Sequence, residues 1–282
     1  MHTTTNNGTG RPVVLIHGNS LSSATWRPQL EAKDLKECNV IAVDLPGHGS
    51  RARNPDDVPY SLEAFALGVI ELISDLDDVV LVGHSLGGHI ALRTLGRSPN
   101  IRGLFLFGMA PLRGVVDMAA AFQPLPVLSK AFSAEITEDD ARQLATLCTW
   151  PESPYMDSFT NMFLQTDPRA RAAIGAEIAS GQTTDEQKLI RSIGIPVCMA
   201  FGENDPLLSF SFLEAQASLF WRQRVHVFKG SGHSPQLHQP SQFNELLIEF
   251  IKSVKNEHDI GSSCRVPAGN GQITRAWTFW IT

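Results

Sequence analysis

The segment GHSLG at residues 83–87 places Ser85 between two glycines, after the apolar run Val79–Val82 and before a segment of helical periodicity. Glycine two positions before and two positions after the serine permits a tight strand-to-helix turn, because no Cβ atom blocks the close approach of the backbone. Such a turn exposes the hydroxyl and directs the first N–H groups of the helix at the same point. We therefore predict that Ser85 is a nucleophile.

A serine hydroxyl is a poor nucleophile without a general base, and histidine is the usual base. Among the nine histidines, His233 follows the apolar run Val225–Phe228 in a loop of small residues, GSGHS. His226 falls inside that run and is predicted to be packed, whereas His238 begins the next segment and is predicted to lie at the surface. We therefore predict that His233 is the base.

The third member of the catalytic set should be an acid that orients the imidazole. The run Pro196–Phe201 is followed by GENDP, which offers Asp205 and, as an alternative, Glu203. Asp205 precedes a proline that stiffens the next step of the chain. We predict Asp205 as the acid, a role that is compatible with capping the following helix.

Hydrolysis through a serine also needs backbone N–H groups that stabilise an oxyanion. The sequence HGNS at residues 17–20 ends an apolar run, so the N–H of Asn19 and the N–H of Leu86 are predicted to form this site. The Asn19 side chain could add a hydrogen bond to substrate. His17 is predicted to be structural, and His84 to line the substrate pocket.

The predicted strands are short, continuous apolar runs, as expected for strands covered on both faces. Helical segments such as Ser61–Ile73 and Gly88–Leu95 alternate with them, which predicts an α/β fold with a mostly parallel sheet and helices on both faces. About ten residues precede the first clear run, which leaves room for one short strand at most, so six or seven strands are expected. The runs are Pro12–Ile16, Asn39–Val43, Val79–Val82, Gly103–Phe107, Pro196–Phe201 and Val225–Phe228.

The alternation is interrupted once, between residues 111 and 194, where helical patterns and prolines replace strands. We expect residues 11–110 and 195–255 to form the core and residues 111–194 to form a helical cap. Ligands of parallel sheets bind outside the carboxyl ends of the strands, so the cap is expected to cover the site. A separate helical bundle with no part in the site is the alternative. Residues 256–282 read as an atypical C-terminal extension.

Composition excludes several classes of protein. Apolar residues make up 43% and charged residues 18%, which is typical of a globular domain, and the net charge of −6 offers no basic surface for nucleic acid. The four cysteines lack metal-ligand spacing, so neither a metal nor another cofactor is expected. The sequence shows neither a signal peptide nor an apolar run long enough for a membrane span, and a cytoplasmic protein is expected. The oligomeric state stays open.

These motifs, together with DLPGHG at residues 44–49, resemble the α/β-hydrolase superfamily over residues 11–255. The runs IHGNSLSS and SLGGHI are similar to the α/β-hydrolase-type N-acylhomoserine lactonases, and the wider likeness extends to carboxylesterases. The resemblance implies an α/β-hydrolase fold with Ser85, Asp205 and His233 as the catalytic triad, and Asn19 with Leu86 as the oxyanion site.

The sequence also departs from those lactonases at three positions. His84 precedes the nucleophile where that group can carry tryptophan, and Asp205 stands where it has glutamate. Tyr155 is the only tyrosine available to match its cap tyrosine. Tyr155 and Trp150 are therefore predicted, with His84, to line the pocket.

The expected activity is serine-dependent hydrolysis of carboxylic esters or lactones with an apolar acyl group, and N-acylhomoserine lactone ring opening is the favoured case. The partner is then a small molecule. A general carboxylesterase for short or medium acyl esters is the first alternative, and a non-catalytic ligand-binding homologue is the second. The pairing of HGN with Trp26 is similar to haloalkane dehalogenases, but those enzymes use an aspartate where this chain has Ser85.

Overall fold

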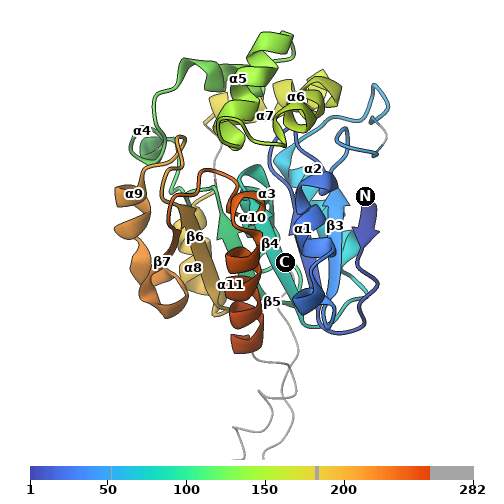
Figure 1. Cartoon of the computed structure of the whole chain (residues 1–282), viewed down its shortest axis with the longest axis vertical. Coiled ribbons are helices and arrows are strands. Elements are labelled where there is room, and N and C mark those ends of the chain that lie inside the picture. Colours follow the sequence, from blue (N-terminus) through green and yellow to red (C-terminus); the bar gives the residue numbers. More distant parts are fainter. Residues whose placement is uncertain (52, 182–183, 255–282) are drawn as a thin grey trace, which may run out of the picture.

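The computed structural model describes residues 1–51, 53–181 and 184–254, and its centre is a seven-stranded sheet (Figure 1). The spatial order of the strands is β1-β3-β2-β4-β5-β6-β7. Strands β2 to β6 form from apolar runs that bury side chains on both faces, whereas β1 is polar and mostly exposed. The strands are β1 His2–Thr5, β2 Pro12–Ile16, β3 Asn39–Asp44, β4 Val79–His84, β5 Ile101–Phe107, β6 Val197–Gly202 and β7 Val225–Phe228.

All neighbouring strands pair in parallel except β1, which runs antiparallel to β3 with His2 opposite Asp44. The prediction of a mostly parallel sheet with at most one short strand before Pro12 is confirmed. Because the remaining strands are parallel, β2, β3, β4, β6 and β7 all end at the same edge of the sheet. The loops that carry the predicted site residues leave the sheet at this edge.

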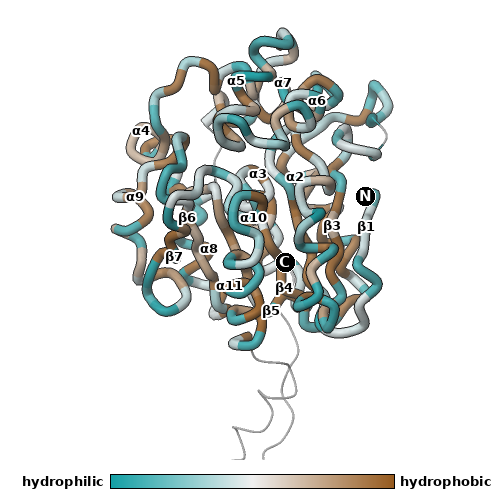
Figure 2. Tube along the Cα trace, in the orientation of Figure 1, coloured by the Kyte–Doolittle hydropathy of each residue, from teal (hydrophilic) through white to brown (hydrophobic). Residues whose placement is uncertain are grey.

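Helices cover both faces of the sheet, and each face has its own hydrophobic cluster. One cluster joins the strands to α2, α3, α8 and α9, and the other joins them to the helical turn at Ser23–Trp26 and to α11. Figure 2 shows hydrophobic residues gathered along the strands and hydrophilic residues on the outer surface. The helices are α1 Arg27–Leu30, α2 Leu62–Leu72, α3 Leu86–Arg93, α8 Glu186–Ile193, α9 Phe210–Glu214, α10 Pro235–His238 and α11 Pro240–Ser253.

Between β5 and β6 the chain forms α4 Met118–Ala121, α5 Glu138–Cys148, α6 Met156–Gln165 and α7 Pro168–Ala179 before α8. Helices α5, α6 and α7, here called the cap layer, lie above the strand ends (Figure 1). Phe159 and Phe163 fill a hydrophobic cluster between α5 and α6, whereas Ala170 and Ile174 of α7 pack with the sheet cluster. Helix α8 lies within the range predicted as a cap, yet its Ile190 packs with the sheet cluster beside α3.

The predicted extension at residues 256–282 lies outside the described residues. Within the described ranges, no helix combines the length and the apolar character needed to cross a bilayer.

Candidate active site

Ser85 lies at the turn between β4 and α3 with φ 51° and ψ −119°, a conformation that L-residues rarely adopt. Both flanking glycines are required by close backbone contacts. A Cβ atom on Gly83 would lie 2.5 Å from the Cα of Gly88, and one on Gly87 would lie 2.3 Å from the carbonyl oxygen of Ile16. The Ser85 N–H donates to the carbonyl of Phe107 at 2.9 Å, which fixes the turn against β5.

His233 and Asp205 form a buried pair, with 2.8 Å between His233 Nδ1 and Asp205 Oδ2. The other carboxylate oxygen, Oδ1, accepts the N–H of Leu207 at 2.8 Å. Because Nδ1 of His233 is engaged by the carboxylate, Nε2 is the ring nitrogen left for a neighbouring hydroxyl. His233 and Ser85 both line the same cavity. The predicted alternative acid, Glu203, is exposed and instead accepts the N–H of Gly230 at 2.8 Å.

The loops that carry the acid and the histidine are held together by their backbones. The N–H of Asn204 donates to the carbonyl of Ser231 at 2.8 Å. A Cβ atom on Gly202 would lie 1.9 Å from the carbonyl oxygen of Gly232, so only glycine allows this approach. The relative position of Asp205 and His233 is therefore set by main-chain contacts at the ends of β6 and β7.

His84 lies against the His233 ring and lines the cavity. Its Nε2–H donates to the carbonyl of His233 at 3.1 Å, and its ring stacks on Phe107 with centroids 4.7 Å apart. Burial holds the pKa of His84 well below its usual value, and His233 nearby lowers it further. The ring is therefore neutral, and it supports the backbone of the histidine loop.

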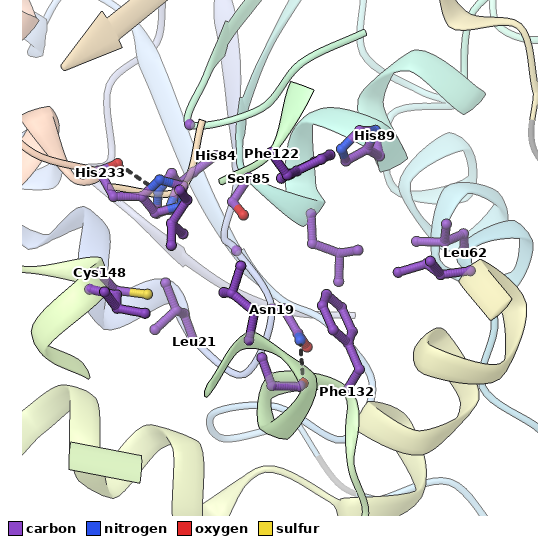
Figure 3. A pocket seen from close by; sticks show the side chains of 18 of the residues that line it. Asn19, Leu21, Leu62, His84, Ser85, His89, Phe122, Phe132, Cys148 and His233 are labelled. Carbon is purple, nitrogen blue, oxygen red and sulfur yellow. Dashed lines mark hydrogen bonds between the residues drawn. The ribbon is translucent and has the colours of Figure 1, made fainter. Parts of the chain in front are cut away.

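The loop after β2 brings Asn19 to the cavity beside Leu86 and Ser85. Leu86 is the first residue of α3, so its N–H has no acceptor within the helix. Among the described residues, no backbone hydrogen bond uses the N–H of Asn19. The Asn19 side chain, which could have been free for substrate, instead donates from Nδ2 to the carbonyl of Ala131 at 2.7 Å (Figure 3).

Two buried side chains hold this loop in place. His17 donates from Nδ1 to the carbonyl of Gly18 at 2.8 Å and accepts the N–H of Leu45 at Nε2. Burial lowers the pKa of His17, which keeps the ring neutral. Asp44 accepts the N–H groups of Ser23 and Ser50, at 2.7 and 2.9 Å. His17 therefore has a structural part in the loop, as the sequence indicated.

The cavity has a volume of about 350 Å³ and lies between the strand ends and the cap layer. In Figure 3, His233 and Cys148 lie on one side, His89 and Leu62 on the opposite side, and Ser85 between them. Apolar side chains dominate the lining, among them Leu21, Leu62, Met118, Phe122, Leu128, Phe132, Leu144 and Phe163.

Trp150 and Tyr155 do not line this cavity, which corrects the prediction made for them. Trp150 stacks on His238 with centroids 4.1 Å apart, and Tyr155 meets the edge of Trp150 at 6.1 Å. Both rings pack against the cluster between α5 and α6, where burying aromatic surface stabilises the cap layer. The partly buried His238 is also less exposed than predicted.

Sequence reasoning missed several polar residues of the cavity lining, among them His89 and Glu186. His89 Nδ1 lies 2.8 Å from Glu186 Oε1. A usable signal existed for His89, because a residue four positions after Ser85 on a helix faces the same side. No local pattern marked Glu186, which is 97 residues away from His89 in the chain.

Comparison with known proteins identifies a family with similar sequences. A model of the alpha/beta hydrolase family matches residues 13–246. A solved structure of a variant of the N-acyl homoserine lactonase AidH, complexed with N-hexanoyl homoserine lactone, superposes with a TM-score of 0.81 at 30% identity and covers 89% of this chain and 93% of that one.

Curated relatives show how wide the chemistry of similar chains is. The pimeloyl-[acyl-carrier protein] methyl ester esterase of Xanthomonas axonopodis pv. citri is 27% identical, covering 88% of this chain and 97% of the esterase. The non-heme chloroperoxidase CPO-A1 of Kitasatospora aureofaciens is also 27% identical, covering 86% and 93%. The match of the family model over most of the sequence, on a seven-stranded sheet with Ser85 at the strand-to-helix turn, shows that the chain belongs to the alpha/beta hydrolase family.

Proposed function

We propose that the protein hydrolyses carboxylic esters or lactones through Ser85, and that ring opening of N-acylhomoserine lactones is its activity. The observation that carries this proposal is the placement of Ser85 and a buried His233–Asp205 pair around one predominantly apolar cavity. An apolar cavity of this volume suits a small ligand with an acyl chain. The likeness to AidH, a lactonase by name, supports the choice of a lactone.

In the proposed mechanism, His233 removes the proton from the Ser85 hydroxyl as the oxygen attacks the carbonyl carbon. Asp205 keeps the proton on Nδ1 of His233, so that Nε2 is the basic nitrogen. The N–H groups of Asn19 and Leu86 stabilise the oxyanion, an interaction typically worth about 10²–10³ in rate for each donor. The leaving oxygen takes the proton from His233, and water then releases the acid.

This proton transfer also fixes the direction of the substrate. The leaving oxygen must point toward His233, so the acyl side of the carbonyl points away from it. Because His233 and His89 lie on opposite sides of Ser85, the acyl side faces His89 and Leu62 (Figure 3). We further propose that residues 111–194 cover the site as a cap, since α5, α6 and α7 each contribute to the cavity lining through residues such as Leu144, Phe163 and Ile178.

The test compares N-hexanoyl- and N-decanoyl-homoserine lactone with p-nitrophenyl butyrate, using the wild-type protein and Ser85→Ala. We expect lactone turnover well above ester turnover, and a loss of at least about 10⁴-fold in kcat for both in the variant. Ester turnover alone would leave a general carboxylesterase. Binding without turnover of any of the three would contradict the proposed hydrolysis and would favour a ligand-binding homologue.

A further inference from the structure

His89 is a polar group in an apolar cavity, and the proposed mechanism does not use it. It lies in the first turn of α3, the helix that begins directly after Ser85, and it lines the cavity together with Ser85 and with Arg93 one turn further. The His89 side chain is 18% exposed, which leaves its ring accessible to a ligand.

Glu186 holds the His89 ring in one orientation. The Glu186 side chain is 8% exposed, and its Oε1 lies 2.8 Å from His89 Nδ1. Its Oε2 accepts the N–H of Leu112 at 3.0 Å, while its own N–H donates to the carbonyl of Leu112 at 2.8 Å. The loop that follows β5 therefore fixes the Glu186 carboxylate, and the carboxylate in turn orients the His89 imidazole, as expected of a positioned binding group.

A second carboxylate holds the next turn of α3 in the same way. Glu177 Oε1 lies 2.8 Å from the Arg93 guanidinium, and Oε2 accepts the N–H of Leu62 at 2.9 Å. Arg93 is thus neutralised by its own partner, and it does not compete for Glu186. This leaves His89 as the hydrogen-bonding group that the α3 face presents to a ligand next to Ser85.

The partner of Nδ1 determines what the other ring nitrogen can do. A carboxylate only accepts hydrogen bonds, so a proton lies on Nδ1 of His89, and in the uncharged form of the ring the lone pair is on Nε2. Within the described ranges, no hydrogen bond engages Nε2. His89 therefore offers an acceptor to the ligand, and its complement is an N–H or O–H group.

We propose that His89, oriented by Glu186, is a specificity-determining residue that accepts a hydrogen bond from an N–H or O–H group two to three bonds from the reacting carbonyl of the substrate. His89 lies three residues of helix, about 4.5 Å along the axis, after Leu86, whose N–H faces the reacting carbonyl, and a hydrogen bond spans about 3 Å. The acyl side of the substrate already faces His89 if the proposed direction of attack holds. An α-amido lactone carries its N–H at this position, so the inference rests on the proposed function and narrows it.

The test measures ligand binding and not turnover, so that it stands apart from the proposed hydrolysis. The protein carries Ser85→Ala, and calorimetry compares N-hexanoyl-homoserine lactone with the matched α-hexanoyloxy-γ-butyrolactone, in which an ester oxygen replaces the amide N–H. We expect the amide to bind about 10-fold more tightly, because the ester oxygen leaves the His89 acceptor unpaired. Adding His89→Leu should bring the ratio of the two affinities to within about twofold.

Glu186→Gln separates the proposed role of the pair from a merely structural one, because only the proposed role predicts a change in the ratio of the two affinities. The N–H of Leu112 requires the amide oxygen of the new glutamine, so its NH₂ group faces His89 Nδ1 and moves the ring proton to Nε2. His89 then becomes a donor, and the preference for the amide should be lost or reversed. His2→Leu, in an exposed histidine of β1, is the matched control and should keep the original ratio.

An unchanged ratio in both His89→Leu and Glu186→Gln would overturn the inference, as would a failure of both ligands to bind. Thermal unfolding of each variant establishes that it is folded, and Glu186→Gln decides the question if His89→Leu does not fold. Absence of p-nitrophenyl butyrate turnover by the wild-type protein would count against the proposed hydrolysis alone.

Discussion

The two sides of the cavity are held by different kinds of interaction. On the strand-end side, main-chain contacts position the loops of Asp205 and His233, as in the approach of Gly202 to the carbonyl of Gly232. On the side of the cap layer, side chains act as the connectors, as with Asn19 on Ala131 and Glu177 on Arg93. Main-chain contacts tolerate little variation in backbone, whereas side-chain contacts can be exchanged one at a time. We therefore expect catalytic geometry and cavity shape to vary independently in this fold.

Arg171 is the strongest example on the cap side. It is 3% exposed, and its guanidinium donates to four main-chain carbonyls, those of Ser133, Ala134, Phe163 and Thr166. Burial lowers the pKa of this side chain. One buried cation thus joins three segments of the cap, where the strand-end side uses hydrogen bonds between neighbouring loops.

The largest effect is expected on the strand-end side, from Asp205→Asn. The variant keeps the shape of the acid but loses the charge that holds the His233 tautomer, so kcat should fall about 10⁴-fold. The control is Glu203→Gln, in the exposed acid two residues earlier, which should change kcat by less than about threefold. Steady-state kinetics on the best substrate measure both. Equal losses in the two variants would contradict the assignment of Asp205.

A second prediction tests the main-chain contacts themselves. Gly87→Ala adds a methyl group 2.3 Å from the carbonyl oxygen of Ile16, and should lower the free energy of unfolding by about 3 kcal/mol. Gly96→Ala meets no atom within 4 Å and bears only the strain of its φ of 73°, so about 1 kcal/mol is expected. Urea unfolding compares them. A loss at position 87 no greater than at position 96 would count against backbone crowding.

The smallest effect concerns the cap layer. Arg171→Met leaves buried carbonyls without donors and should lower the free energy of unfolding by about 2 kcal/mol. KM should rise while kcat changes little, because the strand-end side stays in place. Arg142→Met, which removes an exposed pair with Asp157, should cost less than about 0.5 kcal/mol. A fall in kcat as large as that of Asp205→Asn would show that the two sides are not independent.

The same contrast explains what could be predicted from sequence. The strands at Pro12–Ile16 and Val225–Phe228 have the predicted bounds, because continuous apolar runs and glycine-rich turns are local signals. The loops of Ser85, Asp205 and His233 follow from chain order, and the structure brings these residues to one edge of the sheet.

The cap side was predicted less well because its contacts join residues far apart in the chain. Tyr155 was predicted as cavity lining because it was the only candidate for the cap tyrosine of the similar lactonases, and Trp150 because it is an apolar residue of the cap. The sequence contains nothing that tells an aromatic ring in a cap cluster from one in a pocket. Glu186 reaches His89 only after α8 packs beside α3. Such pairings depend on tertiary packing, which periodicity does not encode.

The backbone conformation of Ser85 has a consequence for selection on stability. A non-glycine residue at φ 51° and ψ −119° costs roughly 1–3 kcal/mol, and glycine would relieve that strain. Selection for thermal stability alone would therefore replace this serine with glycine. If Ser85 is the nucleophile, as proposed, screens for more stable variants should recover inactive Ser85→Gly proteins among their most heat-resistant products.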